Sequence, residues 1–595
     1  MNRWRVSPVP EARARWAPWR VGVAGLASLL WSCAGPPQGA APPVPPVAAA
    51  PAETAPAAPS APLLDIAIVP IPAESALEVR MTSSLPAGNR RWGYRGRAEA
   101  LADLTFSDQD GAVAFRSEPA RGFPTHIILQ REPRGRVSVR YRVTTEPFSV
   151  ERPLWPAMDP NQARFSGELV LLLPEADPDA AVPVRLAIEP KAFAPGATVA
   201  SNLGLGSVVR GQLSTAALSA STFLVGTLGF GEFVAPEGVD RAAWLGYSNF
   251  DPRQVAAEVA GFRSGARQYF GAQRSAPSTL LLVADARKPG QFDVHRRAGG
   301  VLVHAGLMQA WDGPLRITVM QQLMREWIGA ELSIAPADAD FPLESAWFLD
   351  GLNRSVTRAL LFRYGLLTPE EFRDDVQQML RLHVTSPLKS RPLHDLKRAD
   401  PQRASAIIVA RGALYAMVID GAIRKKSGGK RSLDDVVRAL YVQALAASGP
   451  LPPQAFVTAV QAELGQAALA LDSGVLRGDS KIVVPVEAMG PCFVAVKRRY
   501  EVYDLGFERS TDETGVTLAT NVRDPGPAAR AGLHAGERVQ RIRYQDGDVE
   551  TEVDLEVLRG AESVRLRYRP SGGFVIGQGF DRKANTQDAE CARGR

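Results

Sequence analysis

Residues 345–372 read SAWFLDGLNRSVTRALLFRYGLLTPEEF, and this stretch decides the fold class of the middle of the chain. Apolar residues recur at helical spacing over Ser345–Tyr364. Thr368, Pro369 and the two acids after them predict a new helix that begins with a capping threonine. The same periodicity predicts helices at Val255–Phe270, Leu315–Leu332, Pro369–Leu382, Ala404–Ile423 and Leu433–Ala446, and a buried strand at Thr279–Ala284. Residues 213–483 are therefore expected to form a largely helical domain with a small mixed sheet.

Both flanks of this domain have strand patterns. Short alternating runs broken by Pro, Gly and Asp, such as Leu77–Thr82, Arg136–Val143 and Glu168–Leu173, predict an antiparallel β-sandwich over residues 63–212. After residue 484 strands return at Val516–Asn521, Arg538–Tyr544 and Val564–Tyr568, which defines a third domain to residue 570 and leaves a polar tail at 571–595. The sequence therefore predicts an α+β protein of several domains, as its length of 595 residues also indicates.

The amino-terminal residues predict export and a lipid anchor. Residues 1–32 combine a basic start with a short apolar run, which is the layout of a signal peptide and is too short to span a bilayer. Leu30, Ser32 and Cys33 resemble a bacterial lipobox, so Cys33 is the expected lipidated residue. Residues 33–62 continue as a Pro/Ala-rich linker. We expect a lipid-anchored cell-envelope protein, at the outer membrane and facing the periplasm.

Charge and cysteine content narrow the possible partners. Five arginines and one glutamate in residues 1–32 account for +4 of the formal charge of +6, so the remainder carries only +2 and does not resemble a nucleic-acid binder. Three cysteines are too few for a disulfide scaffold. Cys492 and Cys591 could pair in an oxidising compartment, and the sequence leaves this open.

The third domain contains two motifs of a peptide-binding fold. The segment Pro527–Glu537, PAARAGLHAGE, resembles the helix and glycine turn of bacterial PDZ domains. Upstream, Leu505, Gly506 and Phe507 resemble the loop whose backbone amides hold a peptide carboxylate in that fold. The resemblance implies a PDZ domain at residues 484–570 that binds peptides or protein carboxyl termini by strand addition. A purely structural PDZ domain is the alternative.

The order of the three domains resembles that of the PDZ-containing glycyl aminopeptidases, a gluzincin metallopeptidase family. The resemblance is closest where Ser345–Gly351, SAWFLDG, is followed by Tyr364–Phe372, YGLLTPEEF. It implies a thermolysin-like peptidase domain at 213–483. In that family, two histidines one helical turn apart and a downstream glutamate hold zinc, and a glutamate beside the first histidine activates water.

The zinc motif is degenerate in this sequence. The positions that match HExxH read Arg325-Glu326-Trp327-Ile328-Gly329, so the base position is kept as Glu326 and both histidines are replaced. The third ligand position is Asp350. Arg325 supplies positive charge where the family has a metal ligand, and it could pair with Asp350 or Glu326. We therefore expect no zinc. A site improvised from His304, Glu326 and Asp350 is the alternative.

These observations favour a non-catalytic protein. The expected function is a pseudo-peptidase that acts as a peptide-binding or scaffold module of the cell envelope. The alternatives are an active aminopeptidase, with an atypical metal site or a metal-free mechanism around Glu326 and Asp350, and a purely structural envelope protein. The aspartic-protease-like Leu471-Asp472-Ser473-Gly474 is interpreted as a chance match in a loop.

Overall fold

The first strand, β1 (Leu64–Ile71), buries every second residue, as expected for a strand with one face on a core. The computed structural model describes residues 63–593 except 85–89, 97, 119–124, 176, 236–237, 248, 273–275, 400, 448, 470–477, 479–480, 513–514 and 545–546. The predictions on the signal peptide, Cys33, the linker and residues 471–474 lie outside the described residues. Ser60–Arg595 belong to one compact unit of the chain.

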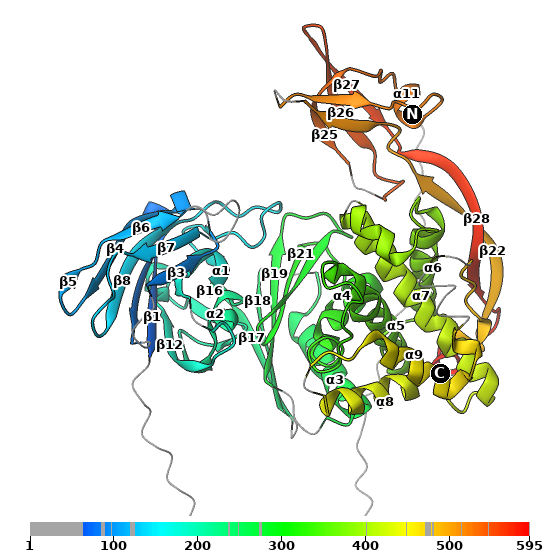
Figure 1. Ribbon diagram of the computed structural model, residues 1–595, viewed down its shortest axis with the longest axis horizontal. Coiled ribbons are helices and arrows are strands. Elements are labelled where there is room, and N and C mark those ends of the chain that lie inside the picture. Colours follow the sequence, from blue (N-terminus) through cyan, green and yellow to red (C-terminus); the bar gives the residue numbers. More distant parts are fainter. Residues whose placement is uncertain are drawn as a thin grey trace, which may run out of the picture. The chain divides into compact units, whose positions relative to one another are not determined.

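Three sheets build the amino-terminal β region (Figure 1). The largest has the order β15 (Val208–Leu213), β12 (Val182–Ile188), β1, β2 (Ala76–Ser83), β8 (Val137–Thr144), β4 (Leu101–Asp108), β5 (Gly111–Ala112). The second has the order β11 (Leu173–Pro174), β3 (Arg91–Tyr94), β7 (Thr125–Leu129), β6 (Phe115–Glu118). The third has the order β14 (Gly204–Leu205), β13 (Thr198–Ser201), β16 (Thr222–Gly226), β10 (Ala163–Ser166), β9 (Ala157–Met158). Because β16 pairs with β10 and β13, this region continues beyond residue 212.

Two details differ from the expected antiparallel sandwich. β1 and β12 run parallel to each other. The predicted strand at Glu168–Leu173 is wrong except at Leu173, because residues 167–170 form the single helical turn α1 (Gly167–Val170) and β11 begins only at Leu173. Two buried tyrosines explain the turn: Tyr94 donates to the Leu169 carbonyl and Tyr141 to the Val170 carbonyl, both at 3.0 Å. An apolar run that satisfies its backbone through side chains needs no strand partner.

A five-stranded mixed sheet begins the middle region. Its order is β17 (Gly229–Ala235), β18 (Gly238–Leu245), β19 (Ser278–Asp285), β21 (Gly300–Gly306), β20 (Phe292–Arg297), with β18, β19 and β21 parallel. Both faces are buried, which explains the continuous apolar run of the predicted strand at 279–284. Leu280 and Val301 face the helical core, while Leu281 and Leu302 pack with Leu224 of β16.

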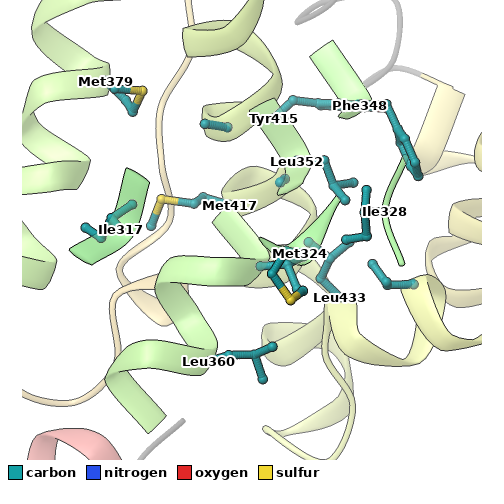
Figure 2. Packing of buried hydrophobic residues seen from close by; sticks show 14 of the residues in the cluster. Ile317, Met324, Ile328, Phe348, Leu352, Leu360, Met379, Tyr415, Met417 and Leu433 are labelled. Atoms are coloured by element: carbon teal, nitrogen blue, oxygen red, sulfur yellow. The ribbon is translucent and has the colours of Figure 1, made fainter. Parts of the chain in front are cut away.

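The helices pack on one face of this sheet and on one another. They are α3 (Pro252–Phe270), α4 (Gly313–Met324), α5 (Asn353–Arg363), α6 (Pro369–Thr385), α7 (Pro401–Ser427), α8 (Leu433–Leu445) and α9 (Pro453–Leu464), with a π-helical turn at Trp347–Leu352. The predicted cap of α6 is confirmed, because Thr368 and Glu371 form a reciprocal capping box. Figure 2 shows side chains from these helices and the segments between them meeting in one core, with Met324, Phe348, Leu352 and Met417 among those labelled.

Helix α7 fills the centre of the helical region. It contains the segment Arg403–Ser427, which is the one helix in the described part of the chain long and apolar enough to cross a membrane. Of its most apolar window, 83% is buried inside the protein, as in the core helix of a globular domain.

The carboxyl-terminal region has two parts. A five-stranded sheet has the order β23 (Glu508–Thr511), β24 (Thr517–Thr520), β25 (Arg538–Arg543), β26 (Val553–Arg559), β27 (Glu562–Tyr568), with the short helix α11 (Pro527–Arg530) beside it. A long ribbon, β22 (Phe493–Tyr503) with β28 (Ser571–Arg582), connects this sheet to the helices. The expected polar tail at 571–595 therefore begins with a strand. A disulfide joins Cys492 to Cys591, in α12 (Asp588–Arg593), at the base of the ribbon.

Candidate functional site

Helix α4 ends at Met324, immediately before Arg325–Gly329, the segment that we predicted to match the zinc motif. The sequence predicted a helix to Leu332, and this is wrong from Arg325 onward. The backbone instead makes turns, in which Gly329 donates to the Leu332 carbonyl at 2.8 Å and Leu332 donates to the Trp327 carbonyl at 2.7 Å. Gly329 has a φ of 138°, which L side chains rarely adopt. Positions 325 and 329 therefore do not lie one turn apart on a helix.

Asp350 reaches this segment from the π-helical turn Trp347–Leu352. Its carboxylate accepts from the Arg325 guanidinium, and Gln321 of α4 donates to its backbone carbonyl at 2.9 Å. The turn lies directly on α7, because a Cβ at Gly351 would come within 2.6 Å of the Val409 carbonyl oxygen. The side chains of Arg325 and Asp350 are 27% and 25% exposed, so solvent partly reaches their ion pair.

Glu326 is held by a different arginine. Its carboxylate accepts from Arg263 of α3, and the same guanidinium donates to Asp240 of β18. Arg267, one helical turn after Arg263, contacts the Asp240 carboxylate at 3.3 Å. Arg263 also lies over the ring of Trp327, with 5.9 Å between the guanidinium carbon and the ring centroid. The side chain of Arg263 is only 1% exposed, whereas that of Glu326 is 26% exposed.

His304 is not part of this cluster. It is completely buried on β21, where Arg164 of β10 donates to its Nδ1 at 3.3 Å and Asp285 lies 3.9 Å away. Burial and the nearby arginines hold the pKa of His304 well below its ordinary value, and burial lowers that of Arg164 to about 10. Within the described residues no three His, Cys, Asp or Glu side chains are grouped so that they could hold a metal ion. The alternative ligand set of His304, Glu326 and Asp350 is therefore wrong.

The side chains present do not fit the zinc that the fold family implies. A zinc site needs three protein ligands within about 2.3 Å of the metal. At the positions predicted to match the ligands stand a permanent cation, Arg325, and a glycine, while the carboxylate of Asp350 is paired with Arg325. Arginine–carboxylate ion pairs occupy this region instead: Arg325 with Asp350, and Arg263 with Glu326 and Asp240.

A second candidate site contains the loop Leu505–Phe507. Leu505 and Phe507 line a cavity of about 1220 Å³, whose other wall comes from α6, α7 and the segment between them. The Gly506 amide donates to the Asp504 carboxylate at 2.8 Å, and Asp504 is also paired with Arg523. In the described residues, no hydrogen-bond partner is found for the amides of Leu505 and Phe507. Of the three backbone amides of the loop, those of Leu505 and Phe507 are therefore available to a ligand, whereas that of Gly506 is bonded to Asp504.

The described regions together share the fold of a solved aminopeptidase N family protein. The structure is similar to an aminopeptidase N family protein from Idiomarina loihiensis, with a TM-score of 0.64 and 16% identity over 89% of this chain and 99% of that chain. A second similar structure is an M1 zinc metallopeptidase from Deinococcus radiodurans, with a TM-score of 0.46 and 16% identity over 71% of this chain and 94% of that chain. A third is native yeast LTA4 hydrolase, with a TM-score of 0.43 and 12% identity over 69% of this chain and 66% of that chain. The fold assignment rests on the first of these.

No protein-family model matches the sequence, and no curated protein matches it. The gluzincin architecture expected from the sequence is thus supported by structural similarity alone. The PDZ assignment and the loss of the zinc motif stay predictions.

The sequence reading missed Arg263, Arg267 and Asp240. A signal was present: Arg263 and Arg267 stand one turn apart on the otherwise apolar face of α3 that includes Val259, Phe262 and Ala266. Arginines at such positions must be paired when buried, which points to an acidic partner.

Proposed function

We propose that this protein is a catalytically inactive relative of the gluzincin aminopeptidases, a pseudo-peptidase that binds peptides or proteins in the bacterial cell envelope. The observation that carries the proposal is the pair of salt bridges Arg325–Asp350 and Arg263–Glu326. Hydrolysis in this family needs a metal-bound water and a free glutamate beside it. Here the ligand and base positions are satisfied by arginines instead.

Binding is assigned to the carboxyl-terminal region. The loop Leu505–Phe507 and the segment Pro527–Glu537 support a PDZ-like domain, and its two free amides support a site for a peptide carboxylate. The lipid on Cys33 would hold the protein at the outer membrane, facing the periplasm. The charge of the body gives no reason to expect nucleic acid as a partner.

Metal content and cleavage test this proposal. The protein, purified without its lipid, is dialysed against trace zinc and analysed by mass spectrometry, and glycyl and alanyl reporter amides are offered as substrates. We expect less than about a tenth of an equivalent of zinc and no cleavage, because three ligands are needed for tight binding. Near-stoichiometric zinc with cleavage would instead establish an atypical aminopeptidase.

Binding needs its own measurement. Fluorescence anisotropy with a labelled peptide, compared as free acid and as carboxyl-terminal amide, reports whether a carboxylate is recognised. We expect the amide to bind at least about tenfold more weakly, a difference of about 1.4 kcal/mol. If the full-length protein binds neither form, peptide recognition is disproved.

A further inference from the structure

The cavity of about 1220 Å³ has walls of different chemistry. One wall contains three cations from the helical region: Arg381 in α6, Lys389 in the segment between α6 and α7, and Arg403 in α7. The opposite wall contains Arg509 and Arg523. These five cations face three lining carboxylates, Glu501, Asp504 and Glu508. The cavity is therefore net positive, although the protein beyond residue 32 is nearly neutral.

Three of the cations, Arg381, Lys389 and Arg509, form no ion pair within the described residues, although Arg381 interacts electrostatically with Asp548 at longer range. Within the described residues, Arg381 donates to the side-chain oxygen of Gln378 at 3.1 Å, Lys389 to the Val384 carbonyl at 2.9 Å and Arg509 to the Tyr544 hydroxyl at 2.9 Å. None of the three lies within ion-pair distance of a carboxylate of the described residues. Elsewhere in the described residues most arginines form ion pairs, so the positive charge of Lys389 and Arg509 is available to an acidic ligand.

The cavity also has an apolar part at its loop end. Leu505 and Phe507 are both at least nine-tenths buried, and Leu382 and Ile407 line the cavity from the helices. The two free amides of Leu505 and Phe507 are next to this apolar patch. An apolar side chain beside a carboxylate is the chemistry of a peptide carboxyl terminus.

A second cavity extends the positive surface. It measures about 540 Å³ and shares Val384, Lys389, Ser390 and Val575 with the first. It adds one further cation, Lys481, and includes no Asp or Glu. A ligand longer than a few residues therefore meets more positive charge along the ribbon strand β28.

We infer that this composite cavity selects the acidic carboxyl-terminal segment of a protein: its apolar last residue packs against Leu505 and Phe507, and acidic side chains upstream face Arg381 and Lys389. The inference rests on the proposed peptide-binding function and adds charge selectivity, which comes from the helical region instead of the carboxyl-terminal sheet. Charge-assisted contacts of this kind are directional and sensitive to salt.

Two labelled octapeptides test the inference on the full-length protein. Both end in valine with a free carboxylate; one carries three glutamates upstream and the other three lysines. We expect the glutamate peptide to bind at least about tenfold more tightly at low salt, and the preference to shrink as the salt concentration is raised. In the double variant Arg381→Gln/Lys389→Gln the preference should fall by about tenfold. Arg373→Gln, on the same helix but outside both cavities, is the matched control and should retain the preference.

The outcomes separate the inference from the function beneath it. Equal binding of the two peptides, with the amidated form weaker, would overturn charge selectivity and leave carboxylate recognition intact. Binding of neither peptide would overturn both. If the double variant still prefers the glutamate peptide, Arg381 and Lys389 do not determine the charge selectivity, and the inference is overturned.

Discussion

The guanidinium of Arg325 donates to the carboxylate of Asp350, and this ion pair joins the end of α4 to the π-helical turn Trp347–Leu352. Both residues stand at positions that we predicted, by resemblance, to match zinc ligands, and the ion pair connects these two positions directly. A cation–carboxylate bridge preserves that connection and supplies positive charge without a metal.

The Arg325–Asp350 pair should contribute modestly to stability. Both side chains are about a quarter exposed, which allows water to screen the charges. A double-mutant cycle of Arg325→Ala and Asp350→Asn, followed by urea unfolding, should give a coupling free energy of about 1 kcal/mol. The more exposed pair Arg142–Glu74 is the control and should couple less. A coupling indistinguishable from zero would show that the bridge does not connect the two elements energetically.

Arg263 should contribute far more to the free energy of unfolding than Glu326, the carboxylate with which it pairs. Its side chain is 1% exposed and pairs with both Asp240 and Glu326. Arg263→Met would leave Asp240 buried with Arg267 as its remaining partner, and we expect a loss of about 3 kcal/mol in the free energy of unfolding.

Glu326→Gln is the matched comparison for Arg263→Met. It keeps the shape of the side chain and leaves Arg263 paired with Asp240, so we expect a loss below about 1 kcal/mol. The same urea titrations measure both variants. Equal destabilisation by the two substitutions would mean that Glu326, at 26% exposure, is as important to the fold as the buried arginine.

Much of the helical framework could be predicted from the sequence, because apolar periodicity and the cap at Thr368 are local signals. The end of α4 could not. The run Met324–Leu332 keeps buried apolar residues at 324, 327, 328 and 332, which a helix and a tight turn place inward equally well. The turn requires a positive φ at Gly329, and the sequence shows only that a glycine is there.

The contacts of the candidate sites also fall into those that the sequence suggested and those that it did not. The Arg325–Asp350 pair was one of two pairings that the aligned motif suggested, and the structure forms it. The Arg263–Asp240 pair joins α3 to β18 across the sheet, a tertiary contact that no short sequence window reports. The cationic cavity likewise has Arg381 of α6 and Arg509 of β23 in its lining, although the second lies more than a hundred residues later in the chain.

Stability should fall as the pH is lowered below about 6.5, partly because of His383. Burial, followed by the positive charges of Arg411 and Lys389, lowers the pKa of His383 to about 4. An unfolded chain takes up the proton below an ordinary histidine pKa near 6.5, whereas the folded chain resists it down to about 4. The unfolded state therefore binds more protons in this window, and the free energy of unfolding decreases with falling pH by up to about 3 kcal/mol.

His383→Gln should flatten this part of the pH profile. The measurement is urea unfolding at several pH values from 7 to about 4. His394→Gln is the control, because that side chain is 73% exposed and makes no buried contact. An unchanged pH dependence in His383→Gln would show that other groups account for the acid sensitivity.

Restoring the zinc ligands by substitution should fail to restore a zinc site. The triple variant Arg325→His/Gly329→His/Asp350→Glu completes the family pattern in sequence, yet α4 has ended before its first histidine. At position 329 a side chain meets a φ of 138°, and its Cβ would lie 3.2 Å from the Arg325 carbonyl oxygen. We expect the variant to be destabilised and to retain less than about a tenth of an equivalent of zinc after dialysis.

The control is the double variant Asp374→His/Gln378→His, which places two histidines one turn apart on an exposed face of α6. It should bind zinc more tightly than the triple variant, as measured by competition with a chelating dye. Stoichiometric zinc in the triple variant would mean that α4 can extend through position 329 and that the fold can hold the metal.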